Sequence, residues 1–185
     1  MDISGKKILI LATHRFEQSE LEVPRDRLKA AGATVDIVSP EAGEIKGWDE
    51  KDWGRPVKVD KALDAVSADD YDAIVLPGGQ INPDLLRVND KALALITAFH
   101  KQKKVIAAVC HAPWLLIETG IIKGRRATSY HSIKTDMINA GAQWEDASVV
   151  TDQGIITSRN PDDLEDFSNK IIEEVAEGRH ARRAA

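Results

Sequence analysis

The segment AAVCHAPWLL contains the only cysteine of the chain, Cys110. A nucleophile elbow needs small residues two positions before and two positions after the nucleophile, because a strand and a helix approach closely there. Ala108 and Ala112 occupy these positions, and Pro113 suits the first turn of a following helix. A thiol at a helix N-terminus lies at the positive end of the helix dipole, which favours the nucleophilic thiolate. The alternative is a buried cysteine that acts as a small hydrophobic side chain.

His111 follows the cysteine and can serve such a site in two ways. Its imidazole is a candidate general base for the thiol. Its backbone N–H is a candidate oxyanion donor, because it belongs to the residue after the nucleophile. Side chains of neighbouring residues at a sharp turn often point apart, so both roles stay open, beside that of an ordinary loop histidine.

A candidate acid, Glu17, lies in the segment HRFEQSE shortly after the first apolar run. If this loop folds over the edge of the sheet, its carboxyl group reaches the thiol and can shuttle a proton. The alternative is a solvated glutamate in the first turn of a helix, which is the interpretation we give to Glu20 and Glu22.

The pair Gly78-Gly79 follows another apolar run and can supply backbone donors. We expect the N–H groups of Gly79 and His111 to form an oxyanion hole, although Gly-Gly turns without a catalytic role are common. The sequence contains no phosphate-binding glycine loop, no H-E-x-x-H and no C-x-x-C motif. We therefore expect neither a dedicated metal site nor a cofactor.

The segments that must position these residues alternate between strand and helix. Continuous apolar runs predict buried strands at 7–12, 34–39, 73–77 and 104–109. Apolar spacing and end signals predict helices at 17–31, from Asn82-Pro83, at 90–101, from Cys110 to Gly120, at 132–139 and from Asn160 to about 177. A charged connection with Trp48 and Trp53 spans 41–56, a strand lies near 127–130, and a hairpin spans 148–158 with its turn at 152–154.

This order of elements predicts an α/β sandwich with a largely parallel sheet. Sites in such sheets form beyond the carboxyl ends of the strands. The segments 14–17, 78–79 and 110–111 each follow a predicted strand. We therefore expect them to meet at one edge of the sheet.

Composition places limits on the class of protein. With 185 residues, we expect one domain over 1–178 and a flexible basic tail over 179–185. The net charge of −5 gives no indication of a nucleic-acid surface, and no apolar run is long enough to span a membrane. A single cysteine cannot form an internal disulfide, which favours a reducing cytoplasm.

Several segments, taken in order, resemble one known family. FEQSEL, DAIVLPGG, AAVCHAPWLL, GRRATSYHSIKTDMINAGAQW and VVTDQGIITSRNPDDL are similar to segments of the PfpI family, within the class I glutamine-amidotransferase-like superfamily, and the similarity covers roughly residues 6–175. The resemblance implies a flavodoxin-like three-layer α/β/α sandwich, a homodimer or larger homo-oligomer, and a cysteine nucleophile that needs no cofactor.

The resemblance also implies roles for individual residues. Cys110 becomes the nucleophile, His111 its neighbour and Glu17 the acid at the sulfur, with Gly79 and His111 as oxyanion donors. Asp84 is the position for an acid supplied by a neighbouring subunit. Ala112 stands where glycine is usual, and Trp114 replaces a residue that is more often polar, which bears on substrate range. We expect the pocket to be lined by His14, Gly78, Trp114, Tyr130 and His131.

Three functions follow as alternatives. The first is a stress-response enzyme of the glyoxalase or deglycase type, in which Cys110 forms a hemithioacetal with a small carbonyl or glycated substrate and Glu17 shuttles the proton. The second is an intracellular cysteine peptidase that uses Cys110, His111 and an acid from a neighbouring subunit. The third is a non-enzymatic chaperone that senses oxidation through Cys110.

Overall fold

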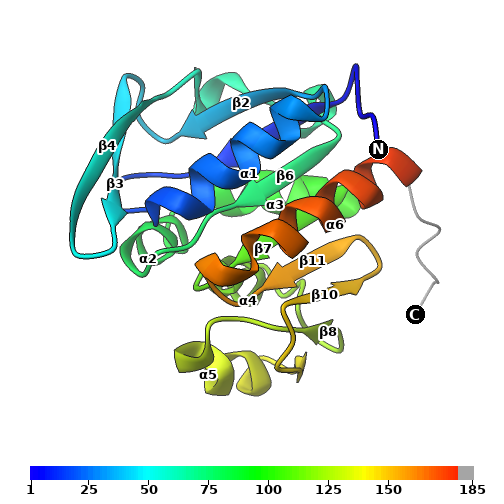
Figure 1. Cartoon of the computed structure of the whole chain (residues 1–185). Helices are drawn as coiled ribbons and strands as arrows, with labels where there is room; N and C mark the ends of the chain where they lie inside the picture. The colour runs from blue at the N-terminus through cyan, green and yellow to red at the C-terminus, as the bar shows by residue number, and fades with distance from the viewer. Residues whose placement is uncertain (179–185) are drawn as a thin grey trace.

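Seven strands form the central sheet of the computed structural model, which describes residues 1–178 (Figure 1). The expected tail at 179–185 lies outside the described residues. The strands are β1 (Lys7–Leu11), β2 (Thr34–Ser39), β5 (Lys61–Ala62), β6 (Ala73–Leu76), β7 (Val105–Val109), β10 (Val149–Asp152) and β11 (Ile155–Ser158). Their order is β10-β11-β7-β6-β1-β2-β5, and only the pair β10–β11 is antiparallel.

Helices cover both faces of this sheet. One face carries α1 (Gln18–Ala30) and α6 (Leu164–Glu177), which lie side by side in Figure 1. The other carries α3 (Asp90–Lys101) and α4 (Pro113–Glu118), with α2 (Ile81–Leu86) and α5 (Lys134–Asn139) packed against α4. Alternate residues of β1 enter the two cores, Ile8 and Ile10 facing α1 and α6, Leu9 and Leu11 facing α3. The predicted three-layer, flavodoxin-like α/β/α sandwich is confirmed.

Two small sheets lie outside the main one. β3 (Glu44–Asp49) and β4 (Asp52–Lys58) form an antiparallel hairpin, and β8 (Arg126–Ala127) pairs with β9 (Gln143–Trp144). The charged connection expected over 41–56 contains this hairpin, which the sequence did not predict, because most of its side chains are exposed and give little apolar alternation. The strand expected near 127–130 corresponds to β8, which ends at Ala127 and does not join the main sheet.

Of two helix N-caps predicted from the sequence, Asn160 is confirmed and Asn82 is wrong. Asn160 caps as predicted, with its side chain accepting from the N–H of Asp162 at 3.0 Å before a short 3-10 turn (Pro161–Asp163) and α6. Asn82 was predicted to begin a helix, but α2 begins at Ile81 and Asn82 is fully buried. Its side chain accepts from the N–H of Thr13 at 2.8 Å and donates to the Pro77 carbonyl at 2.8 Å. Asn82 therefore ties the loop after β1 to the loop after β6.

The order of the strands indicates at which edge of the sheet a functional site can form. β2 lies on one side of β1 and β6 on the other, so the chain changes direction between β1 and β6. Loops diverge at such a switch point and leave a crevice beyond the carboxyl ends of the strands. The loops after β1, β6 and β7 all begin at this edge.

Candidate active site

Cys110 lies on a sharp turn between β7 and α4. Its φ of 63° is in the left-handed region, which a residue with a side chain adopts at a cost and which is frequent at functional sites. The backbone is held on both sides, since the N–H of Cys110 donates to the carbonyl of Ser158 at 3.1 Å and its carbonyl accepts from the N–H of Tyr130 at 2.9 Å. Ala108 and Ala112 are fully buried at the two positions that an elbow needs small.

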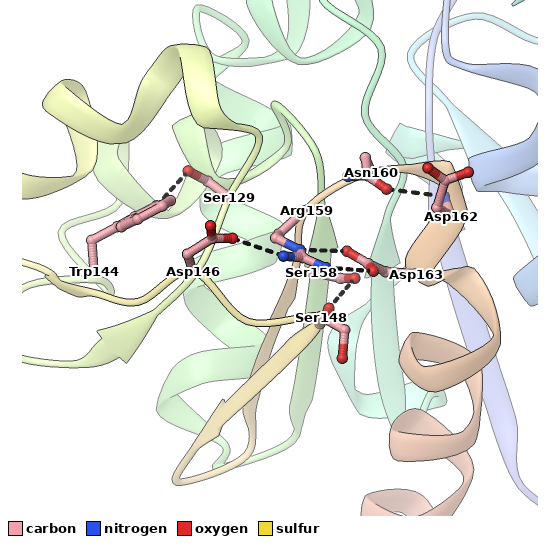
Figure 2. Close-up of polar contacts among 9 residues, drawn as sticks. All are labelled: Ser129, Trp144, Asp146, Ser148, Ser158, Arg159, Asn160, Asp162 and Asp163. Atoms are coloured by element: carbon pink, nitrogen blue, oxygen red, sulfur yellow. Dashed lines mark hydrogen bonds and ion pairs between the residues drawn. The ribbon is translucent and has the colours of Figure 1, made fainter.

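A polar network fixes the segment that supports this turn (Figure 2). The Ser158 hydroxyl donates to the carbonyl of Ser148 at 2.7 Å, and the Arg159 guanidinium pairs with Asp163 at 2.8 Å and with Asp146 at 2.7 Å. These bonds join the end of β11 to the loop before β10 and to the start of α6. The carbonyl that holds Cys110 therefore belongs to a segment that is bonded to two neighbouring parts of the fold.

Glu20 is the carboxyl group at the sulfur. It is fully buried and lies beside the Cys110 side chain, and its Oε2 atom accepts from the N–H groups of Gly78 at 2.8 Å and Gly79 at 3.2 Å. Burial, followed by the negative charge of Glu17, raises the pKa of Glu20 to about 8. At neutral pH this side chain therefore holds a proton that it can donate.

The sequence interpretation of two acids needs correction. Glu17 was expected at the thiol and Glu20 was expected in solvent, but Glu20 occupies the position at the thiol. α1 begins at Gln18 and buries Glu20 on the same face as Leu21 and Leu28, while Glu17 precedes the helix and stays half-buried. The available signal was a carboxylate on the apolar face of a helix, which is rarely buried without a specific partner.

The protonation state of Cys110 depends on that of Glu20. Burial raises the pKa of the thiol, a charged Glu20 raises it further, and hydrogen bonds from the backbone N–H groups of Gly79 and His111 lower it. The expected thiolate therefore does not follow from the helix dipole alone. A proton on Glu20 removes the like charge beside the sulfur and adds a third donor to the two N–H groups, which favours the thiolate.

Both the imidazole and the backbone N–H of His111 lie at the sulfur of Cys110. Its Nδ1 atom lies 3.1 Å from Sγ of Cys110, and its Nε2 atom lies 3.1 Å from the hydroxyl of Ser132. Burial, followed by the charge of His131, lowers the pKa of His111. The imidazole is therefore neutral at pH 7, and the group at its far nitrogen is a hydroxyl rather than a carboxylate.

Aromatic rings enclose His111. Tyr130 stacks on it with a centroid distance of 4.9 Å, and Trp114 contacts it edge-on at 5.2 Å. The indole N–H of Trp114 donates to Asp136 at 2.9 Å, and the guanidinium of Arg87 lies 4.9 Å from its ring centroid. The structure thus brings the predicted pocket residues Tyr130 and Trp114 together around His111; His131, which is exposed, lies against Tyr130 at 4.3 Å.

Two predicted residues lie elsewhere. The Nδ1 atom of exposed His14 accepts from the backbone N–H of Lys46 at 3.1 Å, so this side chain holds the β3–β4 hairpin rather than lining the pocket. Asp84 is exposed on α2, and an action in a neighbouring subunit's site stays a prediction.

A cavity of about 460 Å³ opens beside Gly79 and was not anticipated from the sequence. This volume is in the range of small-molecule sites. The lining residues come from the loops after β1 and β6 and from the hairpin: Arg15, Glu17, Trp48, Trp53, Gly79, Gln80 and Ile81. Sequence reasoning noted the two tryptophans without assigning them a role.

Within residues 1–178, no three His, Cys, Asp or Glu side chains are grouped so that they could hold a metal ion. The helices in this part of the chain are too short or too polar to cross a membrane.

Residues 6–174 match the DJ-1/PfpI family. The chain belongs to the DJ-1/PfpI family. The resemblance to PfpI proteins inferred from the sequence is therefore confirmed over nearly the same residues.

Curated relatives within the DJ-1/PfpI family cover most of the chain. The protein of Bacillus subtilis named "Putative cysteine protease YraA" is 45% identical over 169 residues, which are 91% of this chain and 97% of the relative. The "Deglycase PfpI" of Pyrococcus furiosus is 43% identical over 166 residues, covering 90% of this chain and 97% of the relative. Relatives of this DJ-1/PfpI protein thus carry the names of enzymes.

A solved structure supports the same placement. The crystal structure of DJ-1beta from Drosophila melanogaster superimposes with a TM-score of 0.85 at 30% identity, covering 95% of this chain and 91% of that one. The sandwich described above is therefore the DJ-1/PfpI fold.

Proposed function

We propose that the protein is a cysteine-dependent deglycase that removes dicarbonyl adducts from amines and converts the released carbonyl into a hydroxy acid. The observation that carries the proposal is the contact of one sulfur, Cys110, with a protonated carboxyl group, Glu20, and with the N–H groups of Gly79 and His111. A nucleophile, a proton carrier and oxyanion donors are what this chemistry needs. The relative named Deglycase PfpI supports the same choice.

The first step is displacement of the amine. For an adduct of methylglyoxal, the Cys110 thiolate attacks the carbon that bears the hydroxyl and the amine nitrogen, so a C–S bond forms and the C–N bond breaks. The Glu20 proton goes to the leaving nitrogen. The products are the free amine and a hemithioacetal on Cys110, with its oxygen facing the N–H groups of Gly79 and His111.

The second step moves a proton between adjacent carbons. The Glu20 carboxylate takes the proton from the carbon bound to sulfur and returns it to the neighbouring carbonyl carbon through an enediol. The hemithioacetal thereby becomes a thioester without net oxidation. Water then hydrolyses the thioester to lactate and restores the thiol. The proton shuttle that the sequence assigned to Glu17 is here assigned to Glu20, because Glu20 contacts the sulfur.

A cysteine peptidase is the second candidate. The observation in its favour is the distance of 3.1 Å between Nδ1 of His111 and Sγ of Cys110, together with the protease name of the Bacillus relative. A peptidase also needs an acid that orients the imidazole, but Ser132 occupies the far nitrogen. Asp84 of a neighbouring subunit would have to replace that hydroxyl.

Parallel assays separate these candidates. Wild type and Cys110→Ala receive methylglyoxal, a methylglyoxal-treated amine and a fluorogenic peptide. We expect release of the amine and formation of lactate by wild type only, with no peptide cleavage. Turnover of the peptide alone would select the peptidase. No turnover of any substrate, with protection against aggregation retained in Cys110→Ala, would select a non-enzymatic chaperone.

We also propose that the protein acts in the cytoplasm as a homodimer or larger homo-oligomer. Ile81, Leu85 and Val88 recur at helical spacing along and just after α2, and all three are exposed, which supports an association surface there. Analytical ultracentrifugation tests this, and a monomer at micromolar concentration would contradict it.

A further inference from the structure

The cavity and the group of residues around Cys110 share one residue, Gly79. Gly79 lines the cavity, and its N–H donates to Oε2 of Glu20, the carboxyl group beside the Cys110 thiol. A Cβ atom on Gly79 would lie 2.7 Å from the backbone nitrogen of Glu17, so the two loops are in direct contact. A substrate whose carbonyl carbon reaches the sulfur can therefore extend its remaining part into this cavity.

The hairpin is fixed to the loop that carries Glu17. The N–H of Trp48 donates to the carbonyl of Phe16 at 2.7 Å, and the N–H of Arg15 donates to the carbonyl of Lys46 at 2.7 Å. The segment from Arg15 to Glu17 thus behaves as an additional edge of the hairpin. The backbones of Glu17 and Trp48 therefore lie side by side along one wall of the cavity.

Glu17 is a half-buried carboxylate with acidic neighbours. Burial, and then the negative charges of Asp49 and Glu50, raise its pKa. Within residues 1–178 the one hydrogen bond of its carboxylate comes from the hydroxyl of Ser19, at 3.5 Å, the limit for such a bond. A cation that entered the cavity would relieve the repulsion among these acids.

Two cations of the chain lie over Trp53, the second tryptophan of the cavity, and Arg15 itself lines the cavity. The guanidinium of Arg15 and the ammonium of Lys46 lie 5.1 and 5.2 Å from the ring centroid of Trp53. Neither forms an ion pair with Glu17 among the residues that the structure describes. The indole of Trp48 meets Trp53 edge-on at 6.1 Å and is 38% exposed, so aromatic surface remains open beside the Glu17 carboxylate.

We propose that this cavity is a subsite for the carrier part of the substrate and that it selects carriers with a guanidinium group. A guanidinium is planar, stacks on indole and offers parallel N–H donors to a carboxylate, whereas an ammonium lacks this geometry. Trp48 supplies the stacking surface and Glu17 the carboxylate. This inference rests on the proposed deglycase function and names the amine that the enzyme repairs.

A binding experiment tests the subsite without catalysis. N-acetylarginine amide and N-acetylcitrulline amide have nearly the same shape but differ in charge, and wild-type protein is titrated with each in a calorimeter or by NMR. We expect the arginine compound to bind about tenfold more tightly, or about 1.4 kcal/mol. Glu17→Gln should remove that difference, and Trp48→Leu should weaken binding of the arginine compound. The control is Glu44→Gln, an exposed acid at the start of β3.

Equal binding of the two compounds by wild type, or a preference that survives in Glu17→Gln, would overturn the subsite. Kinetics then links it to turnover, with methylglyoxal adducts of N-acetylarginine amide and N-acetylcysteine amide. In Glu17→Gln we expect KM for the arginine adduct to rise about tenfold relative to KM for the neutral adduct, whereas a change in kcat that acts through the pKa of Glu20 is shared by both adducts. Failure of wild type to process either adduct would reject the deglycase function. The binding experiment would still test the subsite, because it does not depend on turnover.

Discussion

The Oε2 atom of Glu20 accepts a hydrogen bond from the backbone N–H of Gly78 at 2.8 Å, although 58 positions separate the two residues. This bond joins the first turn of α1 to the loop after β6. It places a carboxyl group in the crevice at the switch point of the sheet, where Cys110 arrives from β7. Four predictions follow from the groups that meet there.

The first prediction concerns the proton on Glu20. Its pKa is raised from 4.5 in the unfolded chain to about 8 in the folded protein, so between these values the folded state binds the extra proton. Stability therefore falls as the pH rises from about 4.5 to about 8. Urea unfolding of wild type and Glu20→Gln across this range should show that the substitution removes most of the decline. Parallel curves for the two proteins would contradict a protonated Glu20.

The second prediction concerns the charge of His111. Burial keeps the pKa of its imidazole below the usual 6.5, so the folded state resists the proton that the unfolded state takes up as the pH falls. NMR titration of the ring should give a midpoint below 6.5, and His131→Gln should move it upward by removing a nearby cation. A midpoint above 6.5 would indicate a stabilised imidazolium and would favour the peptidase mechanism.

The third prediction tests the space between α1 and the elbow. A Cβ atom on Gly78 would lie 2.6 Å from Oε2 of Glu20 and 2.7 Å from Cβ of Cys110. Gly78→Ala should cost about 1 to 3 kcal/mol in chemical unfolding and change the rate at which iodoacetamide labels Cys110. Gly120→Ala, where φ is 70° and no atom lies within 4 Å, should cost stability through the backbone alone and leave the labelling unchanged. Similar labelling in both variants would argue against contact across Gly78.

The fourth prediction concerns the support of the elbow from β11. Arg159 pairs with the nearly buried Asp163 and with Asp146, as Figure 2 shows, so Arg159→Ala leaves a buried carboxylate without its cation. We expect a loss of about 1 to 2 kcal/mol in chemical unfolding and lower activity, because the neighbouring Ser158 carbonyl holds Cys110. Arg126→Ala removes an exposed pair with Glu145 and serves as the control, with little expected change in either measurement. Equal effects of the two substitutions would show that the network does not support the elbow.

Much of this architecture could be predicted from the sequence because its strands are buried on both faces. Runs such as KILIL and VIAAV have few alternative conformations, and small residues around Cys110 indicate the turn directly. The order of strands and helices then places the three loops at one edge. These inferences depend on local patterns, which a single sequence contains.

The identity of the acid at the sulfur could not be predicted in the same way. Glu17 and Glu20 are separated by less than one helical turn, and which of them faces the sheet depends on the residue at which α1 begins. The hairpin β3–β4 left a weak signal for a related reason, since few of its side chains are buried, Ile45 and Val57 among them. Backbone bonds also join it to the loop at Arg15 and Phe16. Both errors concern long-range contacts that local periodicity does not encode.

In the subsite that we propose, the β3–β4 hairpin carries the groups that choose the substrate, and the reacting groups lie on other elements. Glu20 lies on α1 and Cys110, His111 and Gly79 lie on the loops after β7 and β6, whereas both tryptophans lie on the hairpin inserted between β2 and β5. An exchange of residues 44–58 for another hairpin of the same backbone pattern would change what the crevice admits and would keep the reacting groups. Exchange of this hairpin as a single unit is therefore a route to new substrate specificities in this fold.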